Sequence, residues 1–213
     1  MLGKAQVCDN AQVYGNSVVC GDTRVYGDAE ICENAQVYGD AQVYDNARIF
    51  YNVRVYGNAQ VYGDAWVHDN AEVNGDAQVF GNAEIYGNSV VCGDTKVFGD
   101  AQVYGDAQVY GDAQVYGNAW VYDNAHVYGN AKVYGNAQIY GNAVIQCMGD
   151  YIVFQNHWSS GRCFTWTKSN NMWSVGCFHG TGEELIKKAY ADSKEKGRMY
   201  EMYVKFVEKL NKC

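Results

Sequence analysis

A six-residue unit repeats without interruption through the first two-thirds of the chain. Its form is Ala-x-Val-Tyr-Gly-Asn/Asp, and Val or Ile stands at every sixth position from Val7 to Ile145, which makes 24 units. The residue two positions before each aliphatic is small, and it is Ala in most units. Side chains two apart on an extended strand point to the same side. Each unit therefore places one small and one aliphatic residue on the same face.

The pair that closes each unit is dominated by Gly and Asn/Asp, as in Gly15-Asn16. Such pairs form tight turns. A four-residue strand followed by a two-residue corner in every unit predicts a coil rather than a series of hairpins. Three units make one triangular turn, so the 24 units predict about 8 turns stacked by parallel strand pairing. The block GNSVVCGDTRVYGD at 15–28 recurs almost unchanged at 87–100, which indicates an internal duplication.

These tandem units resemble the hexapeptide-repeat family, over residues 5–146. The resemblance implies a left-handed, three-sided parallel β-helix that assembles as a homotrimer. The predicted fold class is therefore mainly β, with the β-helix at 1–146 followed by a small α+β C-terminal module at 147–213. The third face is the predicted trimer interface, because Val18, Val90 and Val144 point outward from it.

The residue after each aliphatic also points outward, and it is aromatic in most units. One such column reads Tyr26, Tyr44, Tyr62, Phe80 and Phe98. We expect one ring per turn to stack on the next, which would supplement a narrow core. Wide aromatic surfaces also mark subunit interfaces, so both interpretations stay open.

Charge is divided unevenly along the chain. Residues 1–146 carry 6 basic and 17 acidic side chains, whereas residues 147–213 carry 10 basic and 7 acidic ones. The acidic repeats disfavour a duplex nucleic-acid partner, and an anionic ligand is expected to prefer the C-terminal part. No apolar run is long enough to span a membrane, and the N-terminal MLGKAQVCDN lacks the apolar region of a secretory signal. These features predict a cytoplasmic protein without a membrane partner.

Beyond Ile145 the periodicity stops and a different module is predicted. Strands are expected at 151–154, 162–167 and 172–178, with turns at 159–161 and 169–171. Thr181 and Glu184 form a capping box at the start of a helix that runs to about residue 194. Gly197 is expected to break or bend it before a second, amphipathic helix. The module is also expected to cap the open end of the coil, because the terminus of a solenoid must be covered.

The run HWSSGRCFTWTKSNNMWSVGCFHGTGEE resembles a C-terminal module of uncharacterised proteins of gut bacteria and their phages. The resemblance implies a phage-type protein that sequesters a small nucleotide or a host protein. The run combines flat rings, a cation and hydrogen-bonding groups, and the predicted ligand-binding residues are Trp158, Ser159, Ser160, Arg162, Trp166, Asn170 and Trp173. Such a set fits a planar, nucleotide-like anion. The competing interpretation is that the aromatics form the core of the module and that Arg162 lies at its surface.

Enzymatic chemistry finds little support in the residues. Many hexapeptide proteins are acyltransferases with a histidine base, so a CoA-dependent acyltransferase is the alternative function. The repeats contain only His68 and His126, on different faces and without the family's motif, and no active-site loop projects from them. No catalytic residue, metal site or cofactor is predicted, and Cys163 and Cys177 are expected to be buried strand cysteines. The predicted function is a non-enzymatic oligomeric scaffold whose C-terminal module binds a small anionic ligand or a protein partner.

Overall fold

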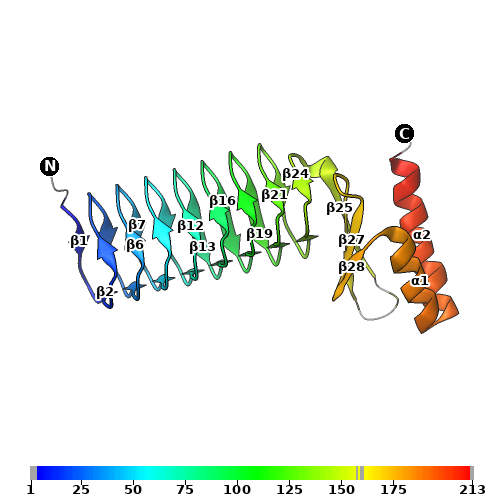
Figure 1. The fold of residues 1–213 in the computed structure, drawn as a ribbon, viewed down its shortest axis with the longest axis horizontal. Helices are drawn as coiled ribbons and strands as arrows, with labels where there is room; N and C mark the ends of the chain where they lie inside the picture. The colour runs from blue at the N-terminus through cyan, green and yellow to red at the C-terminus, as the bar shows by residue number, and fades with distance from the viewer. Residues whose placement is uncertain (1–3, 157, 159–160, 212–213) are drawn as a thin grey trace.

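The protein is a long three-sided coil that ends in a four-stranded sheet and two helices (Figure 1). A computed structural model describes residues 4–156, 158 and 161–211. Each repeat strand pairs in parallel with the strand one turn further on, as Gln6 pairs with Arg24. In the described residues the strands form three parallel sheets of eight strands each, so the predicted parallel β-solenoid of about eight turns is confirmed.

The three sides of the coil are named here sheets A, B and C. Sheet A contains β1 (Gln6–Val7), β4 (Arg24–Val25), β7 (Gln42–Val43), β10 (Gln60–Val61), β13 (Gln78–Gly81), β16 (Lys96–Gly99), β19 (Gln114–Gly117) and β22 (Lys132–Val133). Sheet B contains β2 (Gln12–Val13), β5 (Glu30–Ile31), β8 (Arg48–Ile49), β11 (Trp66–Val67), β14 (Glu84–Ile85), β17 (Gln102–Val103), β20 (Trp120–Val121) and β23 (Gln138–Ile139). Sheet C contains β3 (Val18–Val19), β6 (Gln36–Val37), β9 (Arg54–Val55), β12 (Glu72–Val73), β15 (Val90–Val91), β18 (Gln108–Val109), β21 (His126–Val127) and β24 (Val144–Ile145).

The predicted interior of aliphatic and small residues is confirmed. From Val25 to Ile145 the inward aliphatics are fully buried, and so are the alanines two positions before them. Burying each Val or Ile contributes about 1.5–3 kcal/mol. Val7, in the first turn, is 48% exposed, so the packed core begins with the second turn.

The outward aromatics stack as expected. On sheet A the rings of Tyr26, Tyr44 and Tyr62 follow one another with centroids 4.8 Å apart. On sheet B, His68 takes its place in the column, with its ring 4.9 Å from that of Phe50 and 5.0 Å from that of Tyr86. Each stacked pair adds about 0.5–1.5 kcal/mol beyond the area it buries. The columns therefore brace each turn against the next from outside the narrow core.

The C-terminal sheet is antiparallel and has four strands in sequence order: β25 (Tyr151–Gln155), β26 (Cys163–Thr167), β27 (Met172–Val175) and β28 (Phe178–Gly180). A short 3-10 turn (Met148–Asp150) joins it to the coil. The single strand predicted at 172–178 is wrong, because the chain reverses at Gly176 and Cys177. Gly176 has a φ of +58°, a conformation that favours glycine. Cys177 is consequently exposed and Cys163 half-buried, which corrects the prediction that both are buried.

Two helices cover the sheet, α1 (Gly182–Asp192) and α2 (Lys194–Leu210). The capping box of Thr181 and Glu184 is present as predicted. The break falls at Ser193, which caps α2, and not at Gly197. Gly197 lies inside α2 against the ring of Tyr190, where an added Cβ would meet ring carbons at 2.3 Å. Glycine is therefore required for the close approach of α1 and α2.

The C-terminal sheet lies directly on the last turn of the coil (Figure 1). The Gln138 amide donates to Thr165 Oγ1 at 2.9 Å, and the Tyr151 hydroxyl donates to the Lys132 carbonyl at 2.9 Å. These bonds satisfy main-chain groups that would otherwise pair with a further turn. The sheet thus caps the coil, while the division into domains at 146/147 stays a prediction.

Candidate functional site

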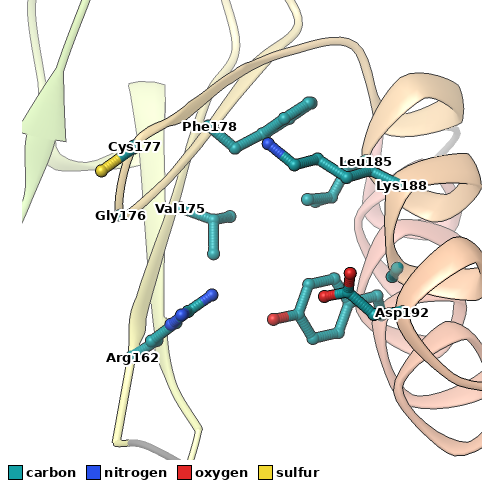
Figure 2. A pocket seen from close by; sticks show the side chains of 10 residues that line it. Arg162, Val175, Gly176, Cys177, Phe178, Leu185, Lys188 and Asp192 are labelled. Atoms are coloured by element: carbon teal, nitrogen blue, oxygen red, sulfur yellow. The ribbon is translucent and has the colours of Figure 1, made fainter.

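A cavity of about 330 Å³ opens between the sheet and the helices of the C-terminal module (Figure 2). It is named here the Arg162 pocket. Its walls come from the start of β26, the β27–β28 turn, α1 and α2. The lining residues are Arg162, Val175, Gly176, Cys177, Phe178, Leu185, Lys188, Ala189, Asp192 and Tyr200.

Two cationic side chains reach this pocket from opposite walls. Arg162 points into it from the sheet, and Lys188 extends toward it from α1 (Figure 2). The main chain at Arg162 is held by its carbonyl, which accepts from the Asn156 amide at 2.9 Å. Lys188 Nζ lies 5.3 Å from the centre of the Phe178 ring. The guanidinium and the ammonium therefore both lie beside one small, partly aromatic space.

The charges around the Arg162 pocket favour an anion. Among the described residues neither Arg162 nor Lys188 forms an ion pair. The one carboxylate in the lining, Asp192, lies 3.4 Å from Lys196 Nζ, so its charge is already opposed. An anion entering the pocket would meet a planar donor fork on one side and a compact cation on the other.

The predicted ligand-binding residues do not gather at one place. Arg162 lines the pocket, whereas Trp158 is half-buried and donates from Nε1 to the Tyr203 hydroxyl at 3.3 Å. Asn170 donates to the Tyr140 carbonyl at 3.2 Å and so helps to fasten the cap. Ser159 and Ser160 lie outside the described residues.

Two of the predicted rings belong to the core of the module. Trp166 and Trp173 are each 2% exposed, in one cluster with Phe164 and Leu185. Trp166 Nε1 donates to Asn171 Oδ1 at 3.0 Å, which satisfies its buried donor. Their exposed edges help to line a second cavity of about 260 Å³.

That second cavity differs from the Arg162 pocket in charge. Its lining includes the carboxylates of Glu183 and Glu208 and no cation. The two carboxylates would therefore repel an anion from the edges of Trp166 and Trp173, whereas Arg162 would attract it.

Lys188, Phe178 and Asp192 line the pocket but are not among the residues predicted from the sequence. Lys188 lies three residues after the buried Leu185 on α1, so its place beside the packed face follows from helical spacing. Helical spacing does not predict the distance between Lys188 and Arg162 across the pocket. That distance depends on the turn at Gly176, a residue that the sequence pattern predicts to lie within a strand.

The histidines lie away from the Arg162 pocket. On sheet B, His68 Nε2 lies 3.1 Å from Glu84 Oε1, and on sheet C the ring of His126 contacts the edge of Tyr110. His179 packs at the junction of cap and coil, 3.2 Å from Ser174 Oγ and 4.3 Å from the Tyr140 ring centre. Burial lowers the pKa of His179. His157 lies outside the described residues.

Two kinds of feature are absent from the described residues. No group of three or more His, Cys, Asp and Glu side chains is placed to hold a metal ion. No helix in this part of the chain combines the length and apolar character needed to cross a membrane.

Comparison with known proteins gives one family match. The model described as the YdcK beta solenoid repeat matches residues 5–21, 41–57, 53–69, 77–93, 107–123 and 113–129. All six segments lie in the coil, so the chain is similar to that family in its repeats, and the match agrees with the β-solenoid of the structure. No curated protein matches the chain.

Proposed function

We propose that the coil is a rigid scaffold and that the C-terminal module binds a small anionic ligand between Arg162 and Lys188 without converting it chemically. The observation that supports this is the placement of a guanidinium and an ammonium around one cavity, neither of them paired with a carboxylate in the described residues. Residues 147–213 carry more basic than acidic side chains, whereas the coil is acidic. This difference in charge would steer an anion toward the C-terminal end.

The chemistry of the pocket favours a phosphate-bearing or carboxylate-bearing ligand. The planar fork of Arg162 matches two oxygens of either group, and Lys188 supplies a compact second charge. The cavity volume of about 330 Å³ is at the lower end of the range of small-molecule sites. It therefore suits the charged end of a nucleotide-like ligand.

Calorimetric titration of pyrophosphate into the full chain tests the proposal. Arg162→Gln and Lys188→Gln should each weaken binding about tenfold to a hundredfold, because each removes a charge-assisted hydrogen bond. Lys187→Gln is the matched control, since Lys187 is the exposed neighbour on α1 and does not line the pocket. Binding that is equal in the native protein and in Arg162→Gln would overturn the proposal, and so would no binding at all.

The alternative of a CoA-dependent acyltransferase rests on the family resemblance alone. A thermal-shift panel of acetyl-CoA with linear and cyclic nucleotides separates the two functions. Stabilisation by acetyl-CoA alone, lost in His68→Ala or His126→Ala, would favour the enzyme. A phage-type sequestering role predicts instead that the bound ligand is recovered chemically unchanged.

A homotrimer built on sheet C belongs to the same proposal. The outward face of sheet C carries Val18, which is 50% exposed, together with the half-buried Val90 and Val144. Light scattering should give three times the chain mass of 23.7 kDa. A monomer at micromolar concentration would contradict it. An interface on sheet C would leave sheet B and the Arg162 pocket open.

A further inference from the structure

A further cavity, of about 300 Å³, adjoins the Arg162 pocket and shares Arg162 and Gly176 with it. It is named here the Trp120 cavity. It lies where sheet B of the last two turns meets the capping sheet. The lining residues are Asn118, Trp120, Asn136, Gln138, Gln155, Gly161, Arg162, Cys163 and Gly176.

Trp120 gives this cavity an aromatic wall. It is one of two tryptophans in the repeats, and it stands at the outward position between Gln102 and Gln138 in the register of sheet B. Its side chain is 38% exposed, unlike the buried Trp166 and Trp173. An indole that is open on one side can stack on a flat ring.

Gln138 lines the same cavity, and its side chain carries an unsatisfied acceptor. Its Oε1 is buried and, within the described residues, is the one buried side-chain oxygen or nitrogen without a hydrogen-bond partner. Its backbone amide is fixed to Thr165 Oγ1 at 2.9 Å, so the strand that carries it is held in place. A buried acceptor that lacks a donor costs about 1–3 kcal/mol. A ligand N–H group would remove this cost once the Gln138 amide turns toward the cavity.

Side-chain amides make up part of the remaining wall. Asn118, Asn136 and Gln155 line the cavity, and Asn118 Nδ2 donates to Asn136 Oδ1 at 3.3 Å. Side-chain amides present a donor and an acceptor next to each other, which matches the hydrogen-bonding edge of a nucleobase. An indole wall with an amide rim therefore fits a flat heterocycle that carries N–H donors.

We propose that the Trp120 cavity binds the base of a nucleotide whose phosphate occupies the Arg162 pocket. This inference rests on the proposed function, because Arg162 joins the two spaces and would hold the phosphate. The base stacks on Trp120, and the Gln138 side chain turns so that its Oε1 accepts an N–H from the base. The ligand class is thus narrowed from small anions to nucleoside phosphates.

Two kinds of probe separate the base from the phosphate. The 5′-monophosphates of adenosine, guanosine, cytidine and uridine are compared by calorimetry with ribose 5-phosphate, which has the same charged end and no base. At least one nucleotide should bind about tenfold tighter than ribose 5-phosphate, because stacking of one base on an aromatic side chain is worth about that much or more.

Matched variants then place the base. Trp120→Leu should abolish the advantage of the nucleotide over ribose 5-phosphate. Trp66→Leu should preserve it, because Trp66 is an exposed tryptophan on the same sheet but outside the cavity. Gln138→Leu should weaken the best nucleotide and leave ribose 5-phosphate unchanged. Far-UV circular dichroism and the Tm establish that each variant is folded.

Each outcome decides between the two proposals. Equal affinity for the nucleotides and ribose 5-phosphate, unchanged in Trp120→Leu, would overturn the base site and leave the anion site standing. Absence of binding by every probe would overturn both. If Trp120→Leu fails to fold, the base site is tested by NMR of the native protein instead. The indole N–H resonance of Trp120 is followed there, and it is assigned by elimination with variants of the other tryptophans. That resonance must then shift with the nucleotide and not with ribose 5-phosphate.

Discussion

The main-chain amide of Val144 donates to Ser169 Oγ at 2.7 Å. One turn earlier, the equivalent amide of His126 donates at 2.8 Å to the carbonyl of Ala143 in the following turn. A side-chain hydroxyl of the cap therefore replaces the main-chain carbonyl that a further turn would supply. The main-chain amide of Gln138 likewise donates to Thr165 Oγ1. The C-terminal module thus satisfies main-chain groups of the last turn with side chains and not with a further strand.

Removing either hydroxyl should destabilise the cap, and the more buried hydroxyl should have the larger effect. Thr165→Val keeps the shape of a side chain that is 1% exposed but leaves the Gln138 amide unsatisfied, which costs about 1–3 kcal/mol. Ser169→Ala should cost less, because Ser169 is exposed and water can replace it. The free energy of unfolding from urea titration measures both. A Thr165→Val variant as stable as the native protein would contradict this account of the cap.

Acid should weaken the junction of cap and coil through His179. Burial lowers the pKa of this histidine, so the folded state binds its proton less readily than the unfolded state. The stability it contributes is present above the unfolded pKa of about 6.5 and is lost as the pH falls below it. The free energy of unfolding should fall more between pH 7.5 and pH 5.5 in the native protein than in His179→Phe. Phenylalanine keeps a ring against Tyr140, which His179 contacts at 4.3 Å. Equal falls in the two proteins would refute this role of His179.

Alkali should unfold the coil through its tyrosine columns. Burial, together with the neighbouring tyrosines, raises the pKa of Tyr44 and Tyr104 to about 12. In the unfolded chain a tyrosine titrates near pH 10. The folded state therefore binds more protons above pH 10, and its stability falls as the pH rises from 10 to 12.

Absorbance of tyrosinate at long wavelength and far-UV circular dichroism should change together in that range. Tyr104→Phe should move the transition to higher pH. Tyr134→Phe, at a ring that is 40% exposed near the end of its column, should move it less. Full ionisation near pH 10 with the coil intact would show that the stacked rings do not stabilise it.

Charge repulsion along one corner of the coil offers a stabilising substitution. Asp76, Asp94 and Asp112 follow one another at equivalent positions of successive turns, at a strand spacing of about 4.8 Å. At another corner Asn and Asp alternate, and Asn46 Nδ2 donates to Asp64 Oδ1 at 2.9 Å. Asp94→Asn should raise the free energy of unfolding by about 0.2–1 kcal/mol, because it replaces like charges with a donor and an acceptor.

The matched control for this substitution is Asp64→Asn, where an amide already faces the carboxylate. Its Tm should stay close to that of the native protein. The gain of Asp94→Asn should shrink with added salt, since salt screens exposed charges. A Tm lowered by Asp94→Asn would indicate that the carboxylates have partners of their own.

The coil could be predicted from the sequence because its contacts are local and periodic. The burial of Val25 and the stacking of Tyr44 on Tyr62 follow from a six-residue spacing alone. In the C-terminal module the sequence pattern correctly predicts the capping box at Thr181, but it also predicts a break or bend of the helix at Gly197. Gly197 instead allows α2 to pack closely against the Tyr190 ring of α1. This contact between two helices is not visible in the residue pattern of either helix alone.

The candidate site was harder to predict for the same reason. Arg162 was identified from its chemistry, yet the rings chosen with it, Trp166 and Trp173, serve the core of the module. Their partners in packing come from α1 and α2, which the sequence does not place. Trp120 of the coil lines the adjoining cavity together with Arg162, and the capping contacts of Thr165 and Ser169 bring the two parts of the chain together.

A crystal structure of the full chain with a bound nucleoside monophosphate tests the central claim most directly. The account predicts the phosphate between Arg162 and Lys188 and the base against Trp120, within reach of Gln138 Oε1. A phosphate bound elsewhere, with Arg162 and Lys188 facing solvent only, would contradict it.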